Sequence, residues 1–231
     1  VLAQDPNNPL QIVFANLDVA YIGPDTFFSF LYLQTSILFV ILLYSGAGMI
    51  CNDFKNNLME IYFSKPLTWV DYCMGKILTL MLLGLSLTAF PGVLLVGLHN
   101  LLLPSMDTLA ASWWWPVAIV GYSFVIVIPT TLGILGCSSL LPSQNYAAIT
   151  VIMLLVANSS LGVLFASMLK QMDYMAISFP LAMRRVGETI FGDDRILFSL
   201  AWYWCFLYVA VVCIIALLIV LRKVRRAEIA L

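Results

Sequence analysis

The side chains that could take part in chemistry or binding are concentrated in the stretch Cys51–Lys76, which reads CNDFKNNLMEIYFSKPLTWVDYCMGK. This stretch lies between two long apolar runs, although only 10% of all residues in the chain are charged. Charges at such a place indicate a surface that meets water or a binding partner rather than lipid. The charged residues of the stretch are Asp53, Lys55, Glu60, Lys65, Asp71 and Lys76.

Sequence patterns of catalytic, metal-binding and nucleotide-binding sites are missing. There is no GxxxxGK(S/T) phosphate-binding loop, so any ATP chemistry must come from a partner. There is no HExxH pattern, and the single histidine, His99, cannot build a usual zinc site. The five cysteines show no CxxC spacing and are expected to be small buried apolar side chains. We therefore expect a chain that is not itself an enzyme and holds no cofactor or metal.

The composition of the chain indicates a protein whose surface is in contact with lipid. It has 231 residues, of which 62% are hydrophobic, whereas a soluble domain has about 25% charged residues. A chain this apolar cannot cover a water-facing surface, and a net charge of −1 argues against nucleic acid as a partner. Because backbone groups in lipid must pair within their own segment, long apolar runs are helices. We expect one all-α membrane domain over residues 1–231, a polytopic helix bundle with five spans: Phe27–Ile50, Ile77–Leu98, Trp113–Gly136, Tyr146–Met168 and Leu200–Leu221.

Lys and Arg near the ends of the spans predict the orientation. The last span runs into RKVRRAEIAL, so we expect a cytoplasmic C-terminus, and counting back places residues 51–72 inside and 1–26 and 169–199 outside. The outer loop 169–199 disagrees with this rule, because it carries Lys170, Arg184, Arg185 and Arg195. We expect Arg184 and Arg185 to be solvated loop charges, with lipid headgroups or a partner's acids as the alternative. The protein is predicted to be a multi-pass protein of the cell (inner) membrane.

An upstream helix is also expected. Five spans with the N-terminus outside are less common than an even number with both ends inside, and the sequence begins with Val rather than Met. We therefore expect a sixth transmembrane helix before this chain, with Val1–Thr26 as the outer loop that follows it.

Helical spacing divides the cytoplasmic segment into two faces. Lys65-Pro66 should end the helix, because proline disfavours helical geometry in the residue before it, and Thr68 or Asp71 should cap the next helix. The pattern predicts one short amphipathic helix along the membrane surface, and its plainest interpretation is an interfacial connector. The apolar stripe is Phe54, Leu58, Ile61 and Tyr62, and the polar stripe is Asp53, Asn57, Glu60 and Ser64.

The order of residues in this segment resembles the ABC transporter type-2 permease family. An acid, then Glu60, then Ser64-Lys65-Pro66, then Gly75-Lys76 entering an apolar helix follow the family's pattern, whereas Asn56-Asn57 replaces its frequent Gly-Thr. The stretches CSSLLPSQNYAA and ISFPLAMRRVGETIFGDDRILFSL also look like parts of the family, with gliding-type members closest.

The resemblance implies a permease subunit with a coupling helix. Segment 51–72 would dock into an ATPase subunit, which binds ATP and Mg, and the permease would work beside a second permease chain in the lipid membrane. Substrate movement, with export expected, would follow ATP hydrolysis. The alternatives are a non-transporting membrane scaffold or force-transmitting subunit of a larger assembly, and a small membrane enzyme. The residues that the resemblance implies at the ATPase contact are Asp53, Asn57, Glu60, Ser64 and Lys65.

Two groups of polar residues lie within the predicted spans. Gln34 and Thr35 belong to the first span, and Asn158 and Ser159 belong to the fourth. Polar groups at membrane depth face other helices or a cavity. They are therefore expected either to form hydrogen bonds between helices or to line a substrate path.

Overall fold

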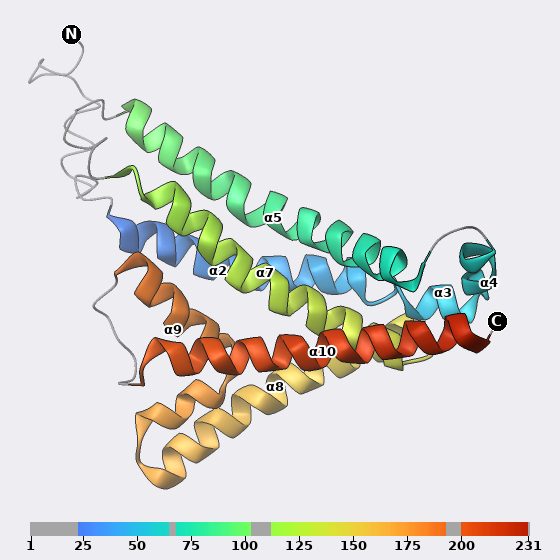
Figure 1. Cartoon of the computed structure of the whole chain (residues 1–231). Helices are drawn as coiled ribbons and strands as arrows, with labels where there is room; N and C mark the ends of the chain where they lie inside the picture. The colour runs from blue at the N-terminus through green and yellow to red at the C-terminus, as the bar shows by residue number, and fades with distance from the viewer. Residues whose placement is uncertain (1–22, 65–67, 103–111, 193–199, 231) are drawn as a thin grey trace, which may run out of the picture.

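The computed structural model describes residues 23–64, 68–102, 112–192 and 200–230, and this part of the chain is an all-α helix bundle (Figure 1). One end of the bundle carries α3, α4 and the C-terminus, and the other carries α9 and the start of α2. The elements are α2 (Pro24–Gly46), α3 (Cys51–Lys55), α4 (Leu58–Phe63), α5 (Trp69–Leu102), α7 (Trp115–Leu140), α8 (Gln144–Leu169), the 3-10 helix η1 (Met172–Ile177), α9 (Phe179–Phe191) and α10 (Trp202–Ala230).

Within the described residues, five helical stretches are long and apolar enough to cross a membrane, as the sequence predicts. They comprise α2 together with α3, then α5, α7, α8 and α10. At 1.5 Å per residue the 34-residue α5 is about 51 Å long, compared with about 30 Å for the hydrocarbon core of a bilayer. It therefore extends beyond the predicted span Ile77–Leu98 at both ends. The protein is a multi-pass membrane protein.

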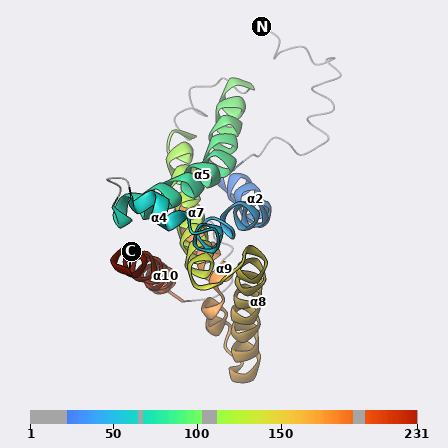
Figure 2. The same cartoon turned by 90° about the vertical axis from the view of Figure 1, so that its right-hand side faces the viewer.

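Helix α7 forms the centre of the bundle (Figure 2). It is the most buried of the five spans and packs against α2, α5, α8 and α10. Its apolar side chains approach glycines on α5: an added Cβ at Gly84 would lie 2.6 Å from Val127, and one at Gly92 would lie 2.7 Å from Ile119. Small residues at such crossings let two helix backbones come close, which is how helices pack in lipid, where the hydrophobic effect does not drive association.

Residues 169–192 are not the open loop that the sequence suggests. Helix α8 is the least buried span and diverges from the bundle. After it the chain turns back, so that η1 lies against α8 and α9 lies against the bundle (Figures 1 and 2). Helix α9 packs against α10 and α7, and an added Cβ at Gly187 would lie 2.4 Å from the Tyr122 ring. The expectation of solvated loop charges is wrong for Arg184 and Arg185, because both pair with the buried Glu188. Arg195 lies outside the described residues.

The segment between the first two spans is two short helices rather than the single amphipathic helix that the spacing predicts. Asn57 has φ 54 and ψ 27, in the left-handed region, and its N–H bonds to the Phe54 carbonyl three residues back. Asparagine adopts this region more readily than other non-glycine residues, so the chain turns there between α3 and α4. After the undescribed residues 65–67, Thr68 and Asp71 do cap α5. The Thr68 N–H and hydroxyl both donate to the Asp71 carboxylate, and the Asp71 N–H donates back to the Thr68 hydroxyl.

Candidate functional site

The turn between α3 and α4 separates the predicted polar stripe into an exposed part and a buried part. Asn57, Glu60 and Ser64 are exposed; Glu60 and Ser64 are four residues apart and share one side of α4, and Asn57 directly precedes its first residue. Ile61 lies on the same side and is also exposed. We call these four residues the α4 face. Lys65 was also predicted at this surface, but it lies outside the described residues.

Asp53 lies away from the α4 face and joins the segment to α5. Its side chain is 10% exposed, and its Oδ2 lies 2.8 Å from Lys76 Nζ. The Tyr72 hydroxyl donates to the same oxygen at 2.7 Å. Tyr72 and Lys76 are four residues apart, so they lie on one side of α5, and the Lys76 ammonium sits 5.4 Å from the Tyr72 ring centre. A buried charge needs such partners, which makes Asp53 an anchor inside this chain.

Further contacts hold the α3–α4 segment against α10 and within the bundle. Met59 is buried, and the Tyr62 and Tyr72 rings lie 5.6 Å apart. The Lys223 ammonium of α10 sits 5.5 Å from the Phe54 ring centre. The segment therefore packs on α5 and α10 instead of standing free in water.

Ser138 of α7 fastens the turn that leads from α2 into α3. Its hydroxyl donates to the Ala47 carbonyl at 2.8 Å and accepts the N–H groups of Ile50 and Cys51, each at 3.2 Å. The first N–H groups of a helix have no partner within it, so this hydroxyl satisfies donors that would otherwise be buried and unpaired. Sequence reasoning missed Ser138, because nothing local in its Cys-Ser-Ser setting indicates a partner 88 residues away.

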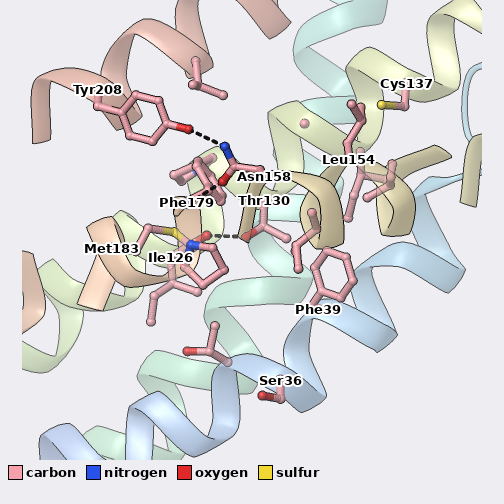
Figure 3. Close-up of a pocket in the computed structure, with 18 of the residues that line it drawn as sticks. Ser36, Phe39, Ile126, Thr130, Cys137, Leu154, Asn158, Phe179, Met183 and Tyr208 are labelled. Atoms are coloured by element: carbon pink, nitrogen blue, oxygen red, sulfur yellow. Dashed lines mark hydrogen bonds between the residues drawn. The ribbon is translucent and has the colours of Figure 1, made fainter. Parts of the chain in front are cut away.

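A pocket of about 500 Å³ lies within the membrane-spanning part, between α2, α7, α8, α9 and α10 (Figure 3). Of the predicted path residues, Thr35 and Asn158 line it, whereas Gln34 and Ser159 do not. Most of its wall is apolar. The side chains in the wall that carry a hydroxyl or amide group are Tyr32, Thr35, Ser36, Tyr122, Thr130, Asn158 and Tyr208.

Two of the four predicted polar residues, Gln34 and Asn158, form hydrogen bonds between helices, which was one of the two predicted roles, whereas the Thr35 hydroxyl donates to the Leu31 carbonyl of its own helix. The Gln34 amide nitrogen donates to the Leu87 carbonyl of α5. The Asn158 amide donates to the Tyr208 hydroxyl at 3.0 Å and accepts the Phe179 N–H at 2.6 Å (Figure 3). Asn158 thereby links α8, α10 and the first residue of α9, and it also forms part of the pocket wall.

Comparison with family models, with curated proteins and with solved structures finds no match to this chain. The functional conclusions therefore depend on the sequence and on the geometry above. Among the described side chains, no three of the types His, Cys, Asp and Glu gather where they could hold a metal ion. Fold and site together define an all-α multi-pass membrane protein with an anchored polar segment at one end and an apolar pocket between its helices.

Proposed function

We propose that this chain is the transmembrane permease subunit of an ABC transporter and that the α4 face docks on a separate ATPase subunit. The observation that carries the proposal is the combination of an exposed polar face with a buried anchor in one short segment. Glu60 is exposed on α4, while Asp53, seven residues earlier, is held by Lys76 and Tyr72 of α5. A connector that only followed the membrane surface would need no buried ion pair.

The anchors explain how force on α4 would reach the membrane. Movement of the α4 face would pass through Asp53 to α5, through Ser138 to α7 and through Phe54 to Lys223 of α10. Packed side chains and ion pairs transmit displacement because protein interiors are close-packed and hardly compressible. ATP and Mg would be bound by the ATPase, whose closure would push on α4, and a second permease chain would complete the substrate pathway. This account requires a cytoplasmic α3–α4 end, which is also the end of the basic C-terminus.

The test is co-purification of the ATPase with two charge-reversed variants. Glu60→Lys should weaken ATPase binding by roughly 30-fold or more, because losing one partner of a buried interfacial charge pair costs at least about 2 kcal/mol. Lys55→Glu is the matched control, since Lys55 is exposed in the same segment but precedes the α4 face. An exposed pair is worth only about 0–1 kcal/mol, so this control should bind nearly as well as wild type. Both variants must insert and express equally.

If Glu60→Lys binds the ATPase as tightly as wild type does, the segment is only an interfacial connector. ATP hydrolysis by the purified chain alone would also contradict the proposal. Stimulation of the complex's ATPase activity by a substrate supports transport, whereas a complex that no substrate stimulates would be a non-transporting or force-transmitting assembly.

A further inference from the structure

The pocket between α2 and α8 is elongated along the bundle and opens sideways. Along α7 its wall runs from Tyr122 to Cys137, which at 1.5 Å per residue is about 22 Å. Ser36 of α2 and Leu154 of α8 both line the pocket and are both exposed, Leu154 by 58%. The opening therefore lies between two spans, at the depth where the surroundings are lipid.

Four polar groups of the wall, those of Thr35, Thr130, Asn158 and Tyr208, are already engaged within the protein. The Thr35 and Thr130 hydroxyls donate to the carbonyls of Leu31 and Ile126 in their own helices. The Asn158 amide is bonded on both its nitrogen and its oxygen. A polar solute would lose its hydration here and gain few hydrogen bonds in return, which costs free energy. An apolar chain, in contrast, would fill the space and restore dispersion contacts that an empty void forfeits.

Near the part of the pocket lined by α9, the described ion pairs of that helix bring two guanidinium groups to one carboxylate. Glu188 is 1% exposed and pairs with Arg184 at 3.0 Å and Arg185 at 3.6 Å, so two guanidinium groups face one carboxylate. The Arg184 guanidinium sits 5.0 Å from the ring centre of Tyr32, which lines the pocket, and the Arg184 side chain is 29% exposed. Only its Nε is bonded to Glu188, and a guanidinium has five N–H donors, so donors remain for an anion.

We propose that this pocket binds an anionic phospholipid, with one acyl chain between α2 and α8 and the phosphate at Arg184. The apolar wall and the lateral opening favour an acyl chain, and the Arg184 guanidinium favours an anionic headgroup. Arg is well suited to phosphate because its planar donors match the oxygens. The inference goes beyond the proposed permease role, since lipid binding at this place requires no ATPase.

Binding of the acyl chain is tested with a variant whose larger side chain fills the pocket. Gly133 lines the pocket, and an added Cβ there meets no atom within 4 Å, so Gly133→Phe should occupy the space without disturbing the helix. Gly121→Phe is the matched control, because Gly121 lies on the same helix, is equally unobstructed and is not part of the pocket wall. The full protein is reconstituted in vesicles of phosphatidylcholine with a minor fraction of phosphatidylglycerol that carries a diazirine in its acyl chain. After irradiation, the labelled residues are mapped by mass spectrometry.

Wild type and Gly121→Phe should be labelled at the pocket residues Phe39, Leu154 and Leu155 well above the lipid-facing Leu33. In Gly133→Phe the labelling of these three residues should fall to the level of Leu33. Labelling of wild type that does not differ between the pocket and Leu33 would overturn the proposal. So would labelling that Gly133→Phe leaves unchanged.

The headgroup part is tested with Arg184→Gln and Arg184→Lys. A charged hydrogen bond is worth about 1.5–3 kcal/mol, so Arg184→Gln should lower pocket labelling by the phosphatidylglycerol probe by roughly tenfold or more. Labelling by a phosphatidylcholine probe with the same diazirine chain should fall less, because the choline ammonium already balances the charge of its phosphate. Arg184→Lys keeps the charge and should restore most of the difference between the probes. Equal pocket labelling of wild type by the two probes would overturn the assignment of an anionic headgroup.

Discussion

Replacing Lys76 tests whether the α3–α4 segment is held by a buried ion pair. Lys76→Met keeps the length and the apolar stem of the side chain but removes the ammonium that lies 2.8 Å from Asp53 Oδ2. Breaking a fully buried pair by removing one partner costs about 3–5 kcal/mol. Here the Lys76 side chain is 22% exposed and Asp53 keeps its hydrogen bond from Tyr72, which reduces the penalty. We expect a loss of roughly 2 kcal/mol in the free energy of unfolding, given that a hydrogen bond to a charged group is worth about 1.5–3 kcal/mol.

The measurement is a double-mutant cycle of stability. Wild type, Lys76→Met, Asp53→Asn and the double variant are purified in detergent micelles, and their unfolding is followed by circular dichroism while sodium dodecyl sulfate is added. The asparagine that replaces Asp53 in the double variant can still accept the Tyr72 hydroxyl but carries no unpaired charge. The double variant should therefore be more stable than Lys76→Met alone, and the coupling between the two positions should be roughly 1–2 kcal/mol.

The control is Lys55→Met, which removes a positive charge from the same segment at an exposed position. Surface substitutions of this kind change stability by no more than about 0.5 kcal/mol. Equal stabilities of Lys76→Met and Lys55→Met would refute the reasoning, because the ion pair would then contribute nothing beyond a solvated charge. A coupling of zero in the cycle would refute it as well.

The remaining predictions concern packing and orientation. Gly84→Leu should destabilise the bundle by about 1–3 kcal/mol, since its Cβ would meet Val127 at 2.6 Å. Gly97→Leu in the same helix should not, because its Cβ is unobstructed. Val127→Ala should partly rescue Gly84→Leu in the same unfolding assay. For the orientation, a membrane-impermeant thiol reagent applied to intact cells should label a cysteine placed at Lys170 but not one placed at Asn56, because the basic C-terminus predicts that the α3–α4 end is cytoplasmic. External labelling at Asn56 would reverse the proposed topology and remove the docking role of α4.

Local chemistry makes some features of segment 51–72 predictable. The capping of α5 by Thr68 and Asp71 could be predicted from four residues of sequence, because both partners lie within one helical turn. The helix–helix break at Asn56-Asn57 has a local cause too, but its signal is weak, since asparagine tolerates the left-handed region without requiring it. The predicted single helix runs through Asn57, where the structure has a turn instead. For this reason the prediction places Asp53 and Glu60 on one stripe, whereas the structure separates them.

Composition and the length of the apolar runs were enough to predict an all-α membrane protein and the places of its five described spans. Lipid offers no hydrogen bonds, so a long apolar run has no alternative to a helix, and composition alone is enough. Only the tertiary structure decided which polar residues face the interior. Asp53 meets residues of a different helix, Ser138 fastens a turn 88 residues away, and Arg184 reaches the pocket wall because α9 folds back on α7. These contacts join segments that are distant in the chain, and helical spacing within one segment carries no information about which neighbour the packing of the bundle will supply.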